Sequence, residues 1–295
     1  MPESADPNRL FDTPAMPVRD SRTTLADGTG PAMHTATVVV PVAHLNSRPV
    51  RNTAPETQLL LGAHMRVHSL KSGWAYGLAL NPLDARAVDY AGWVRARDLV
   101  DTKIVPTHAV AALRAPVFSR PDLKSPIRQS LPITARIKAA GTAEGNGGRF
   151  TQLGGGGFVS DKHLRPLNEV TVDFVDTAEA FQGLPYVWGG NSANGMDCSG
   201  LVKLALQTAG VSAPRDADQQ EAALGRPHRP DSALMNLRRG DLVFWPGHVG
   251  VMQTSGRLLH ANAHHMRVAT EPLRDAVERI GAIRTVKRLE GYGLE

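Results

Sequence analysis

The sequence predicts an α+β domain at its C-terminal end, preceded by two small all-β units. Short β-branched or alternating segments, bounded by glycine and proline, fill residues 33–168. A helical periodicity starts only after Val170, and short apolar strands follow it. A chain of 295 residues is comfortable for two or three domains, and its 28 glycines and 21 prolines favour many turns.

The N-terminal segment, residues 1–32, is predicted to be an extended, proline-rich arm. Charged residues such as Asp12 and Arg19 interrupt it, so it lacks the apolar core of a signal peptide. The longest apolar run, Val38 to Ala43, is far too short to span a bilayer. We therefore expect a cytoplasmic protein that does not bind a membrane.

The first all-β unit is predicted over residues 33–106. Residues 35–42 are rich in β-branched side chains, and residues 59–67 alternate apolar and polar positions, so both segments are predicted strands. Two further short strands are each opened by a glycine, at Gly73 and Gly92.

The second all-β unit is predicted over residues 107–168, where the pattern of the first unit returns. Gly157-Phe158-Val159 corresponds to Gly92-Trp93-Val94 near the end of each unit. Units of this length that end in such a tripeptide resemble bacterial SH3-like barrels. The resemblance implies two SH3-like barrels, and two generic small β-barrels are the alternative.

Residues 169–295 are predicted to form the α+β domain. A helix over residues 173–182 precedes a glycine-rich turn at 189–195, and a second helix over 201–208 follows that turn. Three short apolar segments bounded by glycine or proline are predicted strands, at residues 241–245, 247–253 and 257–261.

Charge and cysteine content exclude several classes of protein. The formal charge of +5 arises from 33 basic and 28 acidic residues, with no basic run longer than a pair, so we expect no nucleic-acid partner. The single cysteine excludes an intramolecular disulfide. The oligomeric state is left open by the sequence.

Cys198, His248 and His260 are the candidate catalytic residues. Cys198 follows the glycine-rich turn at the start of a helix, where backbone N–H groups are expected to lower the thiol pKa and to form part of an oxyanion hole. His248 opens a strand after a Pro-Gly turn, and His260 lies 12 residues later on the next strand. Neighbouring antiparallel strands bring such positions together, so His248 is the predicted base and His260 the group that orients it.

A metal site is the less favoured interpretation of these residues. His264 and His265, with His260 and Cys198, supply only one half of the paired spacing that zinc sites use. The glycine runs at 154–157 and 189–190 lack the order of a phosphate-binding loop. We predict no metal and no cofactor.

The C-terminal part closely resembles the NlpC/p60 family of cysteine peptidases. Five matching stretches occur in the family's order and cover about residues 171–285: Tyr186-Val-Trp-Gly-Gly, Asp197-Cys-Ser-Gly-Leu-Val, Arg239-Gly-Asp-Leu-Val-Phe-Trp, Gly247-His-Val-Gly-Val and Leu259-His-Ala. The resemblance implies a papain-like α+β core and a Cys-His-His triad. It also implies cleavage between D-γ-glutamate and the diamino acid of bacterial cell-wall stem peptides. Substrate contacts are implied for Tyr186, Asp197 and Ser199, with Arg215 and Asp216 as a further pair.

Two SH3-like units ahead of such a domain resemble one branch of the family. That branch holds the murein-peptide-recycling γ-D-glutamyl-L-diamino acid endopeptidases of the dipeptidyl-peptidase VI type, which release L-Ala-D-Glu from free stem peptides. There the first barrel holds the free amine of the substrate, and Tyr90 and Glu56 are the corresponding candidates here. Ala63 stands where relatives often carry an acid, and Asp197 could supply part of the negative charge that a buried ammonium needs.

Three alternatives stay open at this point. The first is a hydrolase of intact peptidoglycan that uses the SH3-like units as wall anchors. The second is a binding protein with an inactive triad, and the third is an acyltransferase or amidase, because Cys-His chemistry serves any acyl transfer. The preferred diamino acid is not specified by the sequence.

Overall fold

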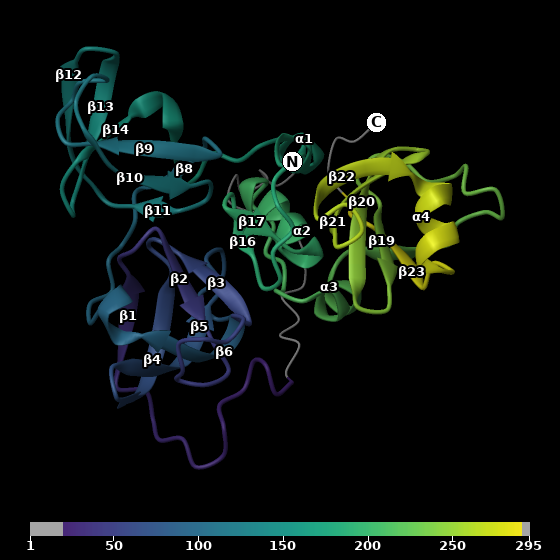
Figure 1. The fold of residues 1–295 in the computed structure, drawn as a ribbon, viewed down its shortest axis with the longest axis horizontal. Coiled ribbons are helices and arrows are strands. Elements are labelled where there is room, and N and C mark those ends of the chain that lie inside the picture. The colour runs from purple at the N-terminus through teal and green to yellow at the C-terminus, as the bar shows by residue number, and fades with distance from the viewer. Residues whose placement is uncertain (1–19, 291–295) are drawn as a thin grey trace, which may run out of the picture.

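The computed structural model describes residues 20–290, which form three lobes (Figure 1). Two lobes consist of strands and lie one above the other at one side of the view. The third lobe carries the α-helices of the described residues and lies beside them. Residues 1–19 of the predicted arm lie outside the described residues.

The first lobe combines a five-stranded sheet, in the order β6-β5-β4-β1-β7, with a two-stranded ribbon, β2-β3. Its elements are β1 (His34–Val38), β2 (Val42–Leu45), β3 (Thr57–Leu60), β4 (His64–Lys71), β5 (Trp74–Leu80), β6 (Val88–Arg95), the 3-10 turn η1 (Ala96–Asp98) and β7 (Leu99–Val100). The predicted strands at 35–42 and 59–67 are each divided in two. Pro41 cannot donate to a strand ladder, and Gly62 turns the chain with a φ of 80°.

The second lobe repeats this plan with a five-stranded sheet, β10-β9-β14-β13-β12, and a three-stranded sheet, β11-β8-β15. Its elements are β8 (His108–Val110), β9 (Arg114–Phe118), β10 (Ile127–Pro132), β11 (Arg136–Ile137), β12 (Ala139–Gly145), β13 (Gly148–Leu153), β14 (Phe158–Ser160), the 3-10 turn η2 (Asp161–His163) and β15 (Leu164–Pro166). Phe118 and Phe150 pack edge to face in its core, with ring centroids 5.9 Å apart. Among the described strands no sheet closes into a barrel, so the predicted SH3-like barrel form is not confirmed.

The third lobe is a mixed fold of helices and an antiparallel sheet in the order β18-β23-β19-β20-β21-β22. Its helices are α1 (Phe174–Ala180), α2 (Cys198–Thr208), α3 (Ala217–Ala223) and α4 (Leu273–Ile280). Its strands are β16 (Asn191–Ser192), β17 (Gly195–Met196), β18 (Arg226–His228), β19 (Leu242–Trp245), β20 (His248–Thr254), β21 (Arg257–Asn262), β22 (Arg267–Pro272) and β23 (Thr285–Arg288). The apolar periodicity of α2 buries Leu201 and Leu204 in one core with Val249 and Val251 of β20.

Buried polar contacts join the lobes. Lys203 on α2 lies 3.0 Å from Asp89 on β6, and the backbone N–H of Asn191 donates to Gln58 Oε1 of β3 at 3.0 Å. The two strand lobes meet where the N–H of Arg136 donates to the carbonyl of Leu61. These contacts hold the first lobe against the start of α2.

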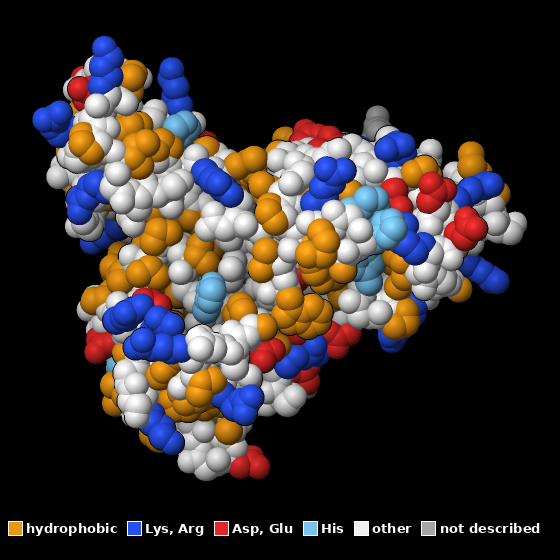
Figure 2. All heavy atoms as spheres, in the orientation of Figure 1, with side chains coloured by type: hydrophobic (Ala, Val, Ile, Leu, Met, Phe, Trp, Pro, Cys, Tyr) orange, Lys and Arg blue, Asp and Glu red, His pale blue; other side chains and the backbone are white. Residues whose placement is uncertain are grey.

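The strands of the first two lobes lie within residues 34–100 and 108–166, and the domain boundaries after residues 106 and 168 stay predictions. Residues 20–33 continue the chain as turns and extended backbone, as part of the predicted arm. No helix within residues 20–290 is long and apolar enough to cross a membrane. Figure 2 shows Lys and Arg side chains scattered over the visible face and histidine side chains gathered on the third lobe.

Candidate active site

Cys198 is the first residue of α2, and a network around Asp197 fixes this end of the helix. Asp197 is the N-cap, and its Oδ1 accepts from the N–H of Gly200 at 2.8 Å, while its Oδ2 accepts from the N–H of Gly189 at 3.0 Å. A side chain at position 200 would not fit, because a Cβ there would lie 2.3 Å from the carbonyl oxygen of Gly190. The glycine-rich turn is therefore clamped onto the helix start.

The thiol of Cys198 is buried, with 7% of the residue exposed. Burial first, and the charge of Asp197 second, raise the pKa of Cys198 to about 11, although the N–H groups of Val249 and Ser199 donate toward the sulfur. The predicted lowering of this pKa by the helix start is therefore wrong for the resting protein. Desolvation outweighs the backbone dipoles here, and the cysteine rests as a neutral thiol.

His248 and His260 form a buried pair on β20 and β21. His248 Nε2 lies 2.9 Å from His260 Nδ1, and the two rings meet edge to face. Gly250 clears the space between the strands, since a Cβ there would lie 3.2 Å from the Cβ of His260. Burial lowers the pKa of each histidine to about 4, so both rings are neutral at neutral pH.

The strand that carries His248 lies against Cys198, the predicted nucleophile. The backbone N–H of Val249, the next residue, lies near the thiol of Cys198 and favours its thiolate form. The three predicted catalytic residues are thus brought to one place by α2, β20 and β21. A buried thiol beside a neutral, oriented imidazole can perform nucleophilic acyl transfer.

Two residues of this site escaped the sequence analysis, Glu271 on β22 and Arg279 on α4. Glu271 Oε1 lies 2.7 Å from His260 Nε2, and Arg279 donates to both carboxylate oxygens of Glu271. The sequence signal that could have found Glu271 is its position in a strand segment. In the alternation of that strand, the Glu271 side chain falls on the buried face, between apolar residues. Without the β21–β22 pairing, nothing in the sequence linked it to His260.

Arg215 is 1% exposed and organises the nucleophile side of the site. Its guanidinium donates to both oxygens of Asp197, at 3.0 and 2.7 Å, and to Ser199 Oγ at 2.9 Å. It also reaches Thr57 on β3 at 2.6 Å, across the lobe boundary. Because protein atoms occupy this guanidinium, Arg215 supports Asp197 and Ser199 in this structure, and the predicted direct contact with substrate stays a prediction.

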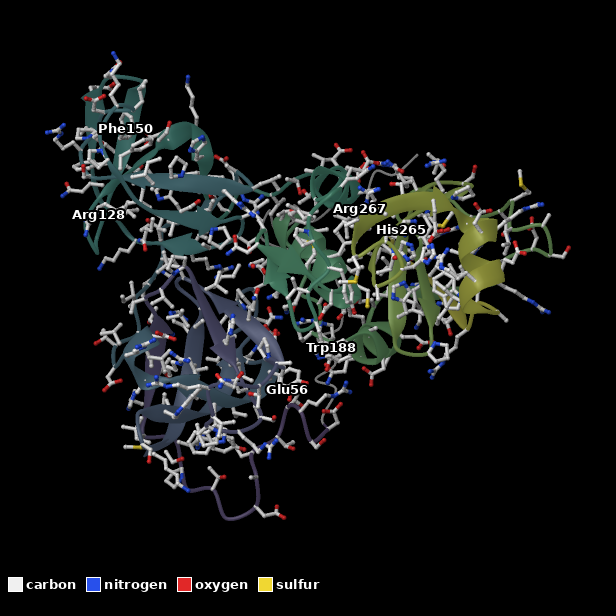
Figure 3. All side chains as sticks on the ribbon, in the orientation of Figure 1. Glu56, Arg128, Phe150, Trp188, His265 and Arg267 are labelled. Carbon is white, nitrogen blue, oxygen red and sulfur yellow. The ribbon has the colours of Figure 1, made fainter. Side chains whose placement is uncertain are left out.

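The other predicted substrate residues fall into two groups. Tyr186 lies beside the nucleophile, and burial, followed by the charges of Cys198 and Asp197, raises its pKa to about 12. Tyr90 lies in the second group, where burial, then the charges of Asp216 and Glu56, raise its pKa. Figure 3 shows Glu56 of the first lobe on the side of Trp188, the residue before the glycine-rich turn, and a Cβ on Gly189 would lie 3.3 Å from the carbonyl oxygen of Glu56.

The second group lies against the glycine-rich turn and is crossed by the N-terminal arm. A Cβ on Gly189 would lie 2.3 Å from the carbonyl oxygen of Pro55, the residue before Glu56. Arg22 of the arm donates to Asp216 at 2.9 Å and to Asp218 of α3. Asp216 thus pairs with Arg22, and the charges of Asp216 and Glu56 both act on Tyr90, so we call Tyr90, Glu56 and Asp216 the polar corner.

One group of side chains has the spacing of a metal site. Ligand atoms of His260, His265 and Glu271 lie within 4.8 Å of one another, and Cys198 is not part of the group. Arg279 already donates to both oxygens of Glu271, and His260 Nδ1 faces His248. A cation here would face a guanidinium, so this arrangement favours the ion pair over a metal.

Comparisons with known proteins point to one family. Residues 183–279, which include Cys198, His248 and His260, match the NlpC/P60 family. Over 225 residues the chain is 28% identical to the gamma-D-glutamyl-L-lysine dipeptidyl-peptidase of Bacillus subtilis (strain 168), covering 70% of this chain and 72% of that protein. Over 252 residues it is 27% identical to dipeptidyl-peptidase 6 of Lysinibacillus sphaericus, covering 77% and 87%. A crystal structure of an NlpC/P60 family protein from Bacillus cereus ATCC 10987 has the same fold, with a TM-score of 0.69 and 22% identity over 88% of this chain and 100% of that one.

Proposed function

Because the chain carries an NlpC/P60 domain, we propose that it is a cysteine peptidase that cleaves the γ-D-glutamyl–diamino acid bond of free murein stem peptides. The observation that carries the proposal is the joint position of the catalytic groups. The backbone N–H of Val249 lies close enough to the thiol of Cys198 to lower its pKa, and the neighbouring residue His248 lies 2.9 Å from His260. The names of the two dipeptidyl-peptidase relatives support this substrate class.

Selectivity for a free N-terminal amine is attributed to the polar corner on the first lobe. An ammonium group needs carboxylates or several acceptors to offset its desolvation. The charges of Glu56 and Asp216 act on Tyr90, and the charge of Asp197 acts on both Asp216 and Cys198. Asp216 is also paired with Arg22, so an amine bound here would share this carboxylate with the guanidinium. A peptide whose amine sits in the corner would present its second residue to Cys198.

The reaction has two steps, acylation of Cys198 and hydrolysis of the thioester, and it starts from a neutral thiol and a neutral imidazole. The sulfur of Cys198 attacks the γ-glutamyl carbonyl carbon while His248 takes the thiol proton, and His248 then gives this proton to the departing diamino acid amine. Water, deprotonated by His248, attacks the resulting thioester, and the returned proton restores the thiol. N–H groups at the start of α2 are suited to stabilise the oxyanion.

The two strand lobes are proposed to be SH3-like units, and the protein is proposed to act in the cytoplasm. The shared plan of the lobes supports the first point. In each lobe a 3-10 turn leads to a short final strand that pairs with the lobe's first strand, β7 with β1 and β15 with β8. The two units are assigned to residues 33–106 and 107–168, and the catalytic domain to residues 169–295.

Mass spectrometry of the products from synthetic L-Ala-γ-D-Glu-diaminopimelate tests this function. The proposal predicts L-Ala-D-Glu and free diaminopimelate from the wild-type protein, and none above background from the Cys198→Ala variant. Cleavage at another bond would point to a different amidase. Unchanged turnover by Cys198→Ala would remove the assigned nucleophile.

A further inference from the structure

A chain of four side chains extends from the catalytic base to the surface of the third lobe. It runs from His248 through His260 and Glu271 to Arg279, and so crosses β20, β21, β22 and α4. His260 is fully buried, Glu271 is 7% exposed, and the side chain of Arg279 is 28% exposed. The contacts at Nδ1 and Nε2 of His260 measure 2.9 and 2.7 Å, well within hydrogen-bond range.

Glu271 is the only anion in this chain of four, and it is held ionised. Burial alone would raise its pKa, but the hydrogen bonds from Arg279 and the neighbouring His260 lower the pKa of Glu271 to about 2. A carboxylate in this form accepts hydrogen bonds and donates none.

An obligate acceptor at one end fixes every proton along the chain. His260 Nε2 must carry the hydrogen that Glu271 accepts, so the neutral ring leaves its Nδ1 as an acceptor. His248 Nε2 must then carry the hydrogen that this Nδ1 accepts. Because His248 is also neutral, its own Nδ1 is unprotonated, and this is the atom able to take the thiol proton.

We propose that Glu271 is a positioning residue, which selects the histidine tautomers that make His248 Nδ1 the base, with Arg279 holding Glu271 in place. The proposal rests on the proposed function for its kinetic consequences, while the tautomers can be measured without substrate. The same carboxylate stabilises the imidazolium that His248 becomes during each proton transfer, because no other carboxylate of the described residues contacts the pair. It has the function that a triad carboxylate has, displaced by one histidine.

The charged and titratable groups near the pair come from the start of α2, the turn between β21 and β22, β22 itself and α4. Cys198 and Asp197 lie on the side of α2, and His265 lies in the turn between β21 and β22, its ring centroid 6.4 Å from that of His260. On α4, Arg279 interacts with Asp275 as well as Glu271. Of these groups, Glu271 is the one that contacts a ring nitrogen of His260 opposite His248.

Histidine nitrogen NMR of the 15N-labelled wild-type protein is the first test, with signals assigned by His248→Gln and His260→Gln variants. The proposal predicts the Nε2–H tautomer for both rings near neutral pH. An Nδ1–H tautomer of His260 would overturn it directly, whatever the substrate of the protein.

The Glu271→Gln variant is the second test, because a glutamine amide can either accept or donate. We expect mixed tautomers, a fall in kcat of about tenfold or more with KM unchanged, and a slower reaction of Cys198 with iodoacetamide at neutral pH. Glu271→Asp should recover part of the loss, since it restores the charge. Glu278→Gln, on an exposed neighbour of Arg279, is the matched control and should behave as wild type.

The substrate-free readouts separate this inference from the proposed function. Cys198 is the single cysteine of the chain, so alkylation reports on this site alone. Unchanged tautomers and alkylation in Glu271→Gln would overturn the positioning role even if the peptide is cleaved. Altered tautomers without any peptide cleavage would keep the positioning role and overturn the proposed substrate. If Glu271→Gln does not fold, the tautomers of the wild-type protein decide the matter.

Discussion

Each half of the active site rests on one guanidinium–carboxylate pair, and the two pairs differ in burial and in effect. On the nucleophile side, the Arg215–Asp197 pair has side-chain exposures of 1% and 12%; on the base side, the Arg279–Glu271 pair has 28% and 9%. Asp197 also caps α2 and raises the pKa of Cys198, whereas Glu271 contacts His260 directly. The Arg215–Asp197 pair fixes the backbone at the start of α2, and the Arg279–Glu271 pair determines where the protons of the two histidines lie.

This difference has a physical origin in what each carboxylate faces. Asp197 is satisfied by two backbone N–H groups and a fully buried arginine, so its removal would leave several donors without partners. Glu271 faces one imidazole nitrogen and an arginine near solvent, so water can replace part of its partners. We therefore expect stability effects on the first side and proton-transfer effects on the second.

The largest expected effect is the loss of stability in the Arg215→Met variant. Breaking a buried pair leaves the Asp197 charge uncompensated, which typically costs about 3–5 kcal/mol of the free energy of unfolding. Thermal melting followed by circular dichroism measures it. Arg226→Met is the control, because Arg226 pairs with Glu290 at an exposed position and should change stability by about 0–1 kcal/mol. Equal melting temperatures for Arg215→Met and Arg226→Met would show that the buried Arg215–Asp197 pair does not stabilise the fold more than an exposed pair.

Asp216→Asn is expected to weaken substrate binding without unfolding the protein. Loss of one carboxylate from the polar corner should raise KM for the free-amine peptide by about tenfold, or about 1.4 kcal/mol, with kcat nearly unchanged. Asp218→Asn is a close control, because Asp216 and Asp218 both pair with Arg22. The charge of Asp216 in addition raises the pKa of Tyr90. Similar KM values for the two variants would contradict the assignment of the amine pocket.

Arg279→Gln is expected to have a smaller effect on stability, about 1 kcal/mol or less, because the guanidinium is partly exposed. Its effect on kcat should be a fewfold decrease, since Glu271 stays ionised near neutral pH. Steady-state kinetics and melting curves measure both quantities, with Arg274→Gln on the same helix as the control. If Arg279→Gln lost as much stability as Arg215→Met, the two ion pairs would contribute equally to the fold, against the expected difference.

A separate expected effect, confined to acidic pH, is a loss of stability on the base side. The pKa of His248 and of His260 is lowered from 6.5 to about 4, so the unfolded chain binds more protons between these values. Their contribution therefore destabilises the fold as the pH falls from 6.5 toward 4, and Glu271, lowered from 4.5 to about 2, adds to this below 4.5. The apparent Tm should fall by about 2–4 °C for each kcal/mol lost. The Tm of the His260→Gln variant should fall less steeply over this pH range than the Tm of the wild-type protein. An equally steep fall would show that the histidines do not cause the acid sensitivity.

Sequence reasoning predicted that Cys198, His248 and His260 would lie in one place, because this prediction depends on short local motifs. Cys198 follows a glycine-rich turn, and His248 and His260 lie on strands joined by a short turn, so their proximity follows from hairpin geometry. The predicted helices and the three predicted strands of this region are present, with ends that differ by a few residues.

The remaining features depend on long-range packing. The thiol pKa was predicted in the wrong direction because burial under β20 cannot be read from the helix start alone. Glu271 joins the site through the pairing of β21 with β22, and Arg279 through the docking of α4. Arg22 reaches Asp216 over a separation of 194 residues, which no local pattern predicts.

We propose that one site recognises a free amine and delivers the γ-glutamyl bond to Cys198. The most direct test of this proposal is mass spectrometry of products from L-Ala-γ-D-Glu-diaminopimelate and its N-acetylated twin, incubated separately with the wild-type protein. We expect L-Ala-D-Glu from the free peptide only. Equal cleavage of both peptides would contradict it and favour a hydrolase of intact peptidoglycan, and cleavage of neither would favour a binding protein or an acyltransferase.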